Sequence, residues 1–487
     1  MTASCILAIA PFIPLVGAVL IGLAGRWPNL RETVTMVTAG LLFVAVASLA
    51  PGVLAGERPA VTLFELLPGL SIAFELEPLG MLFALIASFL WIPNSLYSIG
   101  YMRAHHERHQ TRFYICFAIA LASAVGIAFS GNLLTLFLFY EALTLSTFPL
   151  VTHAGTERAK RAGRVYLGVL LGTSIGFQLL AILATYMLAD TLDFRAGGIL
   201  AGKAPDVVIG ALFALYVFGI GKAALMPFHR WLPAAMVAPT PVSALLHAVA
   251  VVKGGVFTVM KVVVYVFGLD LVKDADAATW LTWAAAFTIL AGSVVALTKD
   301  NLKARLAYST VSQLSYIVLG AMMASSASVV GGSMHILTHA FGKITLFFCA
   351  GAILITAHKE NISDMRGIGR AMPVTMAAFL VGSLSVIGLP PFAGAWSKWY
   401  LALGAMEAGQ VLMVAILVVS SLLNVAYFMP IVVRAFFPGP GATDFDNGYR
   451  EAPLACLVPI LVTAAGCLVL FVFPDPAYTL LRQLVEP

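Results

Sequence analysis

Charged side chains are scarce in this sequence. Asp, Glu, Lys and Arg make up 10% of its 487 residues, whereas hydrophobic residues make up 61%. A soluble domain usually carries about 25% charged residues. A surface so poor in charge cannot face water throughout, so we expect the lipid bilayer to surround most of the chain.

Clustered cysteines are also missing. The five cysteines, Cys5, Cys116, Cys349, Cys456 and Cys467, all lie in apolar runs, and none forms a CxxC pair. Iron–sulfur clusters and structural zinc sites need several thiolates close together. The sequence also has no dinucleotide-binding fingerprint. We therefore expect no cofactor, no metal and no catalytic redox site in this chain.

Long apolar runs are abundant. A membrane-spanning helix needs about 20 mostly apolar residues. Fourteen runs of that kind fall near 4–24, 33–55, 78–100, 113–130, 132–152, 165–188, 207–226, 241–267, 279–298, 304–324, 329–357, 373–392, 410–436 and 453–473. The stretch 395–409 continues the twelfth run past a break. The first run has no basic segment before it and contains Pro11 and Pro14, so we assign it to the mature protein rather than to a signal peptide.

The basic residues predict the orientation. Of the 28 Lys and Arg residues, eighteen lie in loops after odd-numbered runs, and five lie in loops after even-numbered runs or in the C-terminal tail. Cytoplasmic loops carry the excess of Lys and Arg. We therefore expect a multi-pass protein of the inner (plasma) membrane with both termini on the outer side.

The remaining five lysines lie inside apolar runs, and Glu141 is the acid placed well within one. These lysines are Lys222, Lys253, Lys261, Lys343 and Lys398. A charge at the bilayer centre costs about 2.5–3.5 kcal/mol on insertion scales and marks a functional site by default. A lysine near a helix end can instead extend its amine to the headgroups.

Depth in the run separates these two interpretations. Glu141, Lys253 and Lys343 lie near the middle of their runs, which favours a function or a functional ion pair. Lys261 lies closer to the outer end of its run, and headgroup contact explains it. Lys222 and Lys398 lie beside helix breaks, and both interpretations stay open for them.

Three further candidates are histidines. His335, His339 and Lys343 are spaced i, i+4, i+8 and share one helix face. A metal site is one interpretation, but the sequence offers no general-base glutamate and no third ligand nearby. Histidine titrates near neutral pH, which favours a proton relay; simple packing is the third interpretation. His247 lies six residues before Lys253 and could extend the same relay.

Two spans are interrupted by proline. Span seven contains Lys222, Pro227 and Pro233, and span twelve contains Pro390 and Pro391 followed by Lys398. Broken helices survive at membrane depth only where protein or water lines them. Two breaks at matching positions of inverted halves are typical of a midplane ion site. We expect a polar path that runs without interruption from Glu141 to Lys398.

Several motifs resemble one family. LFLFYEALTL, GKAALMPFHRWLPAAMVAPTPVSALLHAVAVVKGG, NLKARLAYSTVSQLSYIVLG, HILTHAFGKITLFFCAGAI and GLPPFAGAWSKW are similar to the antiporter-like subunits of respiratory complex I, group 4 membrane hydrogenases and Mrp-type cation/proton antiporters. The resemblance covers about residues 77–436. It implies an all-α polytopic fold of about 14 transmembrane helices, with two inverted five-helix repeats and broken helices 7 and 12.

The resemblance also implies domains and residue roles. The expected units are N-terminal helices 1–3 (1–112), a first repeat of helices 4–8 (113–267), a second repeat of helices 9–13 (279–436) and a C-terminal helix 14 (437–487). Glu141 and Lys222 match an acid–lysine pair, Lys253 the central lysine, His335, His339 and Lys343 a relay, and Lys398 an exit residue.

The leading functional prediction is a proton- or cation-translocating subunit of a multisubunit complex, with protons and Na⁺ or K⁺ as the ions. The moderate length and SALLHAVAVVKGG most resemble the D-type subunit of Mrp antiporters. The sequence ends soon after the fourteenth run, without the long lateral helix of the largest complex I member. A proton-pumping subunit of complex I or of a group 4 hydrogenase is the alternative.

Three other functions were weighed. Any electron transfer would occur in partner subunits, because this chain has no redox motif. A passive scaffold fits poorly with the buried charges, and the sequence shows no sign of the cavity of an independent solute carrier. The expected partners are other membrane subunits and the lipid bilayer, with no nucleic acid.

Overall fold

The computed structural model describes residues 2–67, 69–274, 276–437 and 448–486. The N-terminal part begins with four helices, of which the first two and the next two each form one apolar segment. A hairpin and one long helix follow. The elements are α1 (Ala3–Ile9), α2 (Phe12–Leu23), α3 (Pro28–Ala47), α4 (Ala50–Leu54), β1 (Ala60–Leu67), β2 (Leu70–Glu75) and α5 (Pro78–Ala104).

The next part contains the first interrupted helix. Its elements are α6 (Gln110–Phe129), α7 (Leu133–Val151), α8 (Glu157–Thr173), η1 (Ser174–Gln178), α9 (Leu179–Ala189), α10 (Asp206–Gly219), η2 (Gly221–Ala223), α11 (Trp231–Ala234), η3 (Ala235–Val237), α12 (Thr240–Ala244), η4 (Leu245–Val249), α13 (Val251–Val262) and η5 (Val263–Phe267). The segments η1, η4 and η5 are π-helical, whereas η2 and η3 are 3₁₀ turns. Short π segments inside longer helices are frequent at functional sites.

The last part contains the second interrupted helix. Its elements are α14 (Leu269–Asp274), α15 (Asp276–Thr298), α16 (Leu302–Met323), α17 (Ser326–Ala357), η6 (Ile362–Asp364), α18 (Ile368–Ala371), α19 (Pro373–Ile387), α20 (Gly394–Glu407), α21 (Val411–Phe436), α22 (Leu454–Val472) and α23 (Asp475–Arg482). Residues 438–447 of the expected C-terminal unit lie outside the described residues.

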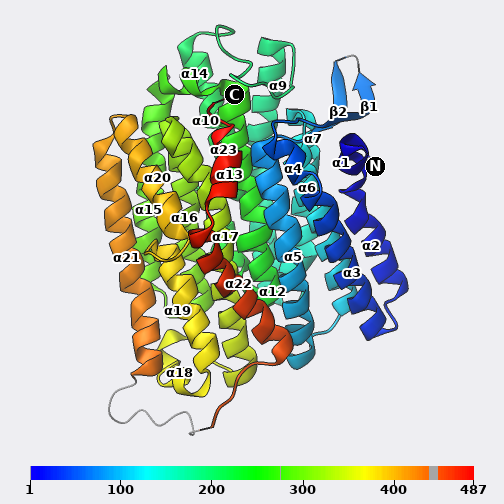
Figure 1. The fold of residues 1–487 in the computed structure, drawn as a ribbon, viewed down its shortest axis with the longest axis vertical. Coiled ribbons are helices and arrows are strands. Elements are labelled where there is room, and N and C mark those ends of the chain that lie inside the picture. The colour runs from blue at the N-terminus through cyan, green and yellow to red at the C-terminus, as the bar shows by residue number, and fades with distance from the viewer. Residues whose placement is uncertain (1, 68, 275, 438–447, 487) are drawn as a thin grey trace.

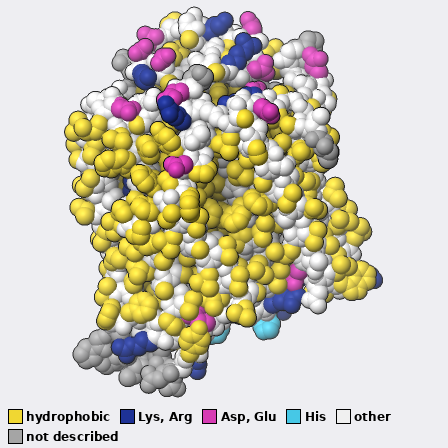
Figure 2. Space-filling view, viewed as in Figure 1, with side chains coloured by type: hydrophobic (Ala, Val, Ile, Leu, Met, Phe, Trp, Pro, Cys, Tyr) yellow, Lys and Arg dark blue, Asp and Glu magenta, His cyan; other side chains and the backbone are white. Residues whose placement is uncertain are grey.

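The predicted polytopic fold is confirmed. Within the described ranges, 12 helical segments are long and apolar enough to cross a membrane, and two shorter apolar helices, Asp206–Gly219 and Pro373–Ile387, accompany them. These two are the first halves of the interrupted spans. Apolar side chains form a broad band around the middle of the visible face, while charged side chains gather at its two ends (Figure 2).

Sequence signals explain where several helices begin. Asn132 accepts a hydrogen bond from the Thr135 amide at the start of α7, and Asn301 accepts one from the Ala304 amide at the start of α16. Ser325 and Ser328 form a reciprocal capping box at α17. Such caps satisfy amides that have no partner inside the helix.

The hairpin was not predicted. β1 and β2 pair antiparallel, with Ala60 opposite Glu75. Ser130 forms a bridge with Phe74, and Asn132 Nδ2 donates to Ser71 O at 2.9 Å, which ties the hairpin to the α6–α7 junction. We call this end of the bundle the hairpin end and the opposite end, which carries α18, the α18 end (Figure 1).

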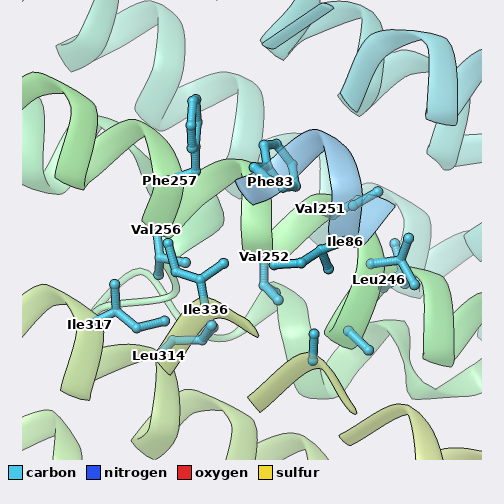
Figure 3. Close-up of a cluster of buried hydrophobic side chains, with 14 of the residues drawn as sticks. Phe83, Ile86, Leu246, Val251, Val252, Val256, Phe257, Leu314, Ile317 and Ile336 are labelled. Atoms are coloured by element: carbon cyan, nitrogen blue, oxygen red, sulfur yellow. The ribbon is translucent and has the colours of Figure 1, made fainter. Parts of the chain in front are cut away.

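Helices α13 and α17 form the centre of the bundle. α17 contacts α5, α12, α16, α19, α20 and α22, and α13 contacts both α16 and α17. A fully buried apolar cluster surrounds α13, with Phe83 and Ile86 from α5, Leu314 and Ile317 from α16, and Ile336 from α17 (Figure 3). Charged side chains on α13 and α17 are therefore far from lipid.

Candidate functional site

Lys253 and His339 meet at the centre of the molecule. Lys253 lies on α13 and His339 on α17, and both are almost completely buried. Lys253 Nζ lies 2.7 Å from His339 Nδ1, a hydrogen-bonding distance. A proton can pass between these two bases without either leaving its place, because one accepts where the other donates.

A chain of polar side chains continues from His339 toward α20. The rings of His339 and His335 lie 5.8 Å apart, centroid to centroid. His335 Nε2 lies 3.1 Å from Gln313 Oε1, and His335 Nδ1 lies 2.9 Å from Ser397 Oγ. The relay expected on one face of α17 therefore has polar partners on two neighbouring helices.

Asn424 on α21 joins this chain to Lys398. With its amide oriented to satisfy its neighbours, Asn424 Oδ1 accepts from Gln313 Nε2 at 3.1 Å and from Lys398 Nζ at 3.2 Å. Lys398 also donates to Ile387 O at 2.8 Å and to Ser421 Oγ at 3.0 Å. Ile387 is the last residue of α19, so the broken helix supplies a carbonyl to the lysine that follows it.

Lys343 reaches the same asparagine by a second branch. Lys343 Nζ donates to Ser309 Oγ at 2.7 Å and to Leu306 O at 3.3 Å. Ser309 Oγ lies 2.8 Å from the Tyr427 hydroxyl, which in turn hydrogen-bonds to Asn424. Lys343 and Lys398 therefore share one buried network of hydrogen bonds, and Lys253 approaches it through His339, whose ring lies 5.8 Å from that of His335.

Lys222, at the first interrupted helix, lies outside this network of hydrogen bonds and bonds to α7 instead. Lys222 Nζ donates to Tyr140 O at 2.8 Å and to Thr144 Oγ1 at 2.6 Å, and it lies over the Tyr140 ring. Both carboxylate oxygens of Glu141 are buried without a hydrogen-bond partner among the described residues. Within those ranges, no ion pair of 4.0 Å or less joins Glu141 to Lys222, and no hydrogen bond joins either to Lys253.

Three of the four candidate prolines lie between helices. Pro227 lies in the turn after η2, and Pro390 and Pro391 lie between α19 and α20. Pro233 instead lies inside the short helix α11. Gly388 ends α19 with a φ of 91°, which glycine adopts without a steric cost.

His247 is buried in the π-helical segment η4. Neither ring nitrogen has a hydrogen-bond partner in the described part of the chain, and its ring lies 4.6 Å from that of Phe347.

A metal site was one interpretation of the histidines. The described residues contain no group of three His, Cys, Asp or Glu side chains arranged to hold a metal ion.

The interpretation of Lys261 as a headgroup-contacting lysine is wrong. Its side chain is fully buried, and its amine forms an ion pair with Glu77 Oε1 at 3.0 Å and donates to Ser130 O at 2.7 Å. Glu77 also caps α5 by accepting from the Leu79 and Gly80 amides. Distance along the run did not reveal that Glu77, Ser130 and the Phe194 ring enclose this end of α13.

Several network residues were missed by sequence reasoning. They are uncharged polar residues within apolar runs: Ser309, Gln313, Ser397, Ser421, Asn424 and Tyr427. Serine and threonine in helices commonly bond to their own backbone, as Thr310 and Thr345 do here. Only the amides Gln313 and Asn424 are unusual enough in a span to serve as a signal.

Comparisons with known proteins agree with this architecture. The family model described as NADH:quinone oxidoreductase/Mrp antiporter, TM, matches residues 130–424. The chain is 33% identical over 475 residues to NADH-quinone oxidoreductase subunit N of Desulforudis audaxviator, covering 94% of each chain. It is 32% identical over 354 residues to NAD(P)H-quinone oxidoreductase chain 5 of Synechocystis sp., of which it covers 49%.

Two solved structures share the fold. A chain of the Mrp complex from Dietzia sp. superposes with a TM-score of 0.88 at 22% identity, covering 100% of this chain and 97% of that one. A chain of the membrane-bound sulfane sulfur reductase, an archaeal respiratory membrane complex, superposes with a TM-score of 0.86 at 24% identity, covering 99% and 97%. By family model and by identity, this chain belongs to the NADH:quinone oxidoreductase/Mrp antiporter membrane family.

Proposed function

We propose that this chain is the proton-translocating, antiporter-like subunit of a multisubunit membrane complex, equivalent to the D-type subunit of an Mrp monovalent cation/proton antiporter. The observation that carries the proposal is the hydrogen bond between Lys253 and His339. The His339 ring lies 5.8 Å from that of His335, from which hydrogen bonds lead through Gln313 and Asn424 to Lys398. Buried bases in series, each within reach of the next, are what proton relays in membranes require.

The proposed roles follow from position. Lys253 is the central proton carrier, His339, His335 and Lys343 pass the proton through the second half, and Lys398 releases it. Glu141 and Lys222 control the charge in the first half, and His247 feeds the centre. The break at Pro390–Pro391 keeps the carbonyl of Ile387 available to Lys398, whereas Lys222, beside the break at Pro227, donates to Tyr140 O of α7.

The domain division forms part of the proposal. Residues 113–267 and 279–436 form two inverted five-helix repeats, between an N-terminal unit of residues 1–112 and a C-terminal unit of 437–487. In support, each proposed repeat contains one of the two shortened apolar helices, α10 and α19. Lys253 belongs to the first repeat and His339 to the second, so the central hydrogen bond joins the two.

The structure also supports a state-dependent role for Glu141. Its carboxylate is buried without a hydrogen-bond partner among the described residues, and the Lys222 amine donates to Tyr140 O and Thr144 Oγ1 instead. An unpaired buried carboxylate is costly. Formation of a Glu141–Lys222 pair in a second conformation would remove that cost and change the field at Lys253.

Purified complex carrying Lys253→Ala tests the proposal. In vesicles, we expect exchange of protons for Na⁺ or K⁺ to fall below a tenth of the parental rate. Lys160→Ala removes an exposed lysine on α8 and should transport normally. Parental rates in Lys253→Ala, with the complex fully assembled, would refute the relay.

A complex I subunit is the second candidate, favoured by the 33% identity to a subunit N over nearly the full length of both chains. Identification of the co-purified subunits separates the two. Partners that bind NADH or quinone, and proton transport that depends on electron donors, support the complex I assignment. Cation-driven proton exchange without a redox substrate supports the Mrp assignment.

A further inference from the structure

Two stripes of polar residues face each other across α5 and α12. On α5, Trp91, Asn94, Ser98 and Tyr101 recur at helical spacing and are all buried. Residues at such spacing share one helix face. On α12 and η4, Thr240, Ser243 and His247 form a matching buried stripe, and α5 contacts both of these segments.

Gly351 of α17 packs against both α5 and α12. A Cβ atom at Gly351 would lie 2.2 Å from the Tyr97 hydroxyl oxygen and 2.7 Å from Thr240 Cγ2. Helices α5, α12 and α17 therefore approach closely at this point, and the polar stripes lie next to the helix that carries His339.

Most polar atoms of the stripes have no hydrogen-bond partner within the described chain. They are Trp91 Nε1, Asn94 Nδ2 and Oδ1, Thr240 Oγ1, Ser243 Oγ, and both ring nitrogens of His247. Each such atom costs about 1–3 kcal/mol if it is buried dry. Seven of them on two facing stripes indicate internal water, because water bridges buried polar groups of this kind.

The two ends of the stripes differ. Toward the α18 end, the Tyr101 ring stacks on His105, which is exposed at the C-terminus of α5. Toward the hairpin end, Phe83, Ile86, Leu246 and Val252 close the space with apolar side chains (Figure 3). These apolar side chains bound the space between the stripes on the hairpin side of His247.

We propose that α5 and α12 enclose a water file that carries protons from the α18 end to His247 and from there to His339. This proposal rests on the proposed function, since it supplies protons to the relay at Lys253. His339 Nε2 is also buried without a partner in the described ranges, so it can accept from water while Nδ1 contacts Lys253. α5 lies outside both proposed repeats, and this route assigns it a role in transport.

The proton balance is simple. A protonated water gives a proton to one ring nitrogen of neutral His247, which becomes an imidazolium. The imidazolium releases the proton on its other nitrogen to the next water, which gives it to His339 Nε2. Each step breaks one O–H or N–H bond and forms another, so a single positive charge moves and no other reactant is needed.

Hydroxyl-radical labelling by X-ray radiolysis of the intact complex tests for the water itself. Radicals formed from bound water modify the side chains beside it. Trp91 should be oxidised at least fivefold faster than Trp231, which is equally buried but donates its Nε1–H to Gly221 O at 2.9 Å. Equal labelling of the two tryptophans would overturn the proposal.

Transport by two variants tests for the route. Asn94→Leu keeps the branched shape of the side chain but removes both polar atoms, and we expect at least a tenfold lower transport rate together with slower Trp91 oxidation. Ser243→Ala should lower the rate several-fold, and it serves if Asn94→Leu fails to assemble. Its matched control is Ser88→Ala on α5, whose hydroxyl already bonds to Ala84 O at 2.7 Å and whose loss should leave the rate unchanged.

The outcomes separate this inference from the proposed function. Parental rates in both Asn94→Leu and Ser243→Ala, with Lys253→Ala inactive, would overturn the water route and leave the relay standing. Parental rates in Lys253→Ala as well would remove the proposed function itself.

Discussion

At the scale of single residues, Asn424 is the junction of the buried network. It contacts Lys398, Gln313 and Tyr427, and through Tyr427 and Ser309 it reaches Lys343. Two lysines on different helices therefore respond to one amide. In the orientation that satisfies its neighbours, the Asn424 oxygen accepts directly from Lys398, while its nitrogen donates to the Tyr427 hydroxyl on the side of Lys343.

Removal of the Tyr427 hydroxyl should disconnect Lys343. In Tyr427→Phe, Ser309 and Asn424 lose a common partner, which costs about 1–1.5 kcal/mol. We expect transport by the assembled complex to slow by about tenfold. Tyr216→Phe is the control, because it removes a buried hydroxyl that bonds to Thr185 outside the network; equal rates for the two variants would contradict this role.

The buried Glu77–Lys261 pair gives a prediction about stability. Glu77→Gln leaves the Lys261 ammonium buried without its carboxylate, and breaking such a pair costs about 3–5 kcal/mol. We expect a clearly lower Tm in detergent. The double variant Glu77→Gln/Lys261→Met removes both charges and should recover most of the loss. A single variant as stable as the parent would show that the pair contributes little.

At the scale of elements, α13 and the 3₁₀ turn η2 determine where Lys222 lies. A Cβ atom on Gly255 would lie 2.4 Å from both Ala223 N and Lys222 C. The backbones of α13 and of the first break therefore touch at a glycine. The close approach couples the position of Lys222 to the helix that carries Lys253, although no hydrogen bond joins the two lysines in the described chain.

Adjacent glycines provide a matched test of that contact. Gly255→Ala should displace η2 and reduce both assembly and transport, because backbone atoms cannot yield as a flexible side chain can. Gly254→Ala should be tolerated, since its Cβ would meet only Ile127 and Leu143 side-chain atoms at 3.4 Å. Western blotting of membranes and transport assays distinguish the two, and equal behaviour would count against the contact.

The sequence predicted the membrane spans and their breaks but not the hairpin. Every predicted apolar run corresponds to a helix, because a bilayer demands long apolar segments and hydropathy detects them directly. The breaks at Pro227 and at Pro390–Pro391 were also predicted. The hairpin was missed because β1 and β2 are short and lie between spans, although the β-branched and aromatic residues in VTLFE were a signal.

The candidate site was recovered where charge marked it. Lys253, His339, His335, Lys343 and Lys398 all lie in the network, since a buried charge is rare enough to stand out. Gln313 and Asn424 were missed because uncharged polar residues are cheaper to bury. The pairing of Glu141 with Lys222 depends on side-chain direction at a helix break, which no spacing rule supplies.

At the scale of the whole molecule, we propose that the α18 end faces the cytoplasm. The N-terminal turns of α8 and α16, which lie at this end, are rich in Lys and Arg, in line with the positive-inside rule. Both termini lie toward the other end of the bundle (Figure 1). The proposed water file opens at the α18 end and would then draw protons from the cytoplasm.

Cysteine labelling checks this orientation. Lys203→Cys, exposed between α9 and α10 at the hairpin end, should react with an impermeant maleimide in intact spheroplasts. Lys160→Cys, exposed on α8 at the α18 end, should react only after the membrane is permeabilised. The parental protein measures the background from its native cysteines. The reverse pattern would invert the orientation.

The contact between Lys253 and His339 has a consequence for how such a protein can be divided. Lys253 comes from α13 and His339 from α17, so a proton shared between them is bound by both halves of the chain together. Splitting the polypeptide between α13 and α15 would leave two fragments, each with one of the two bases that bind the proton. Co-expression of the two fragments should restore proton transport only where they associate into one helical bundle.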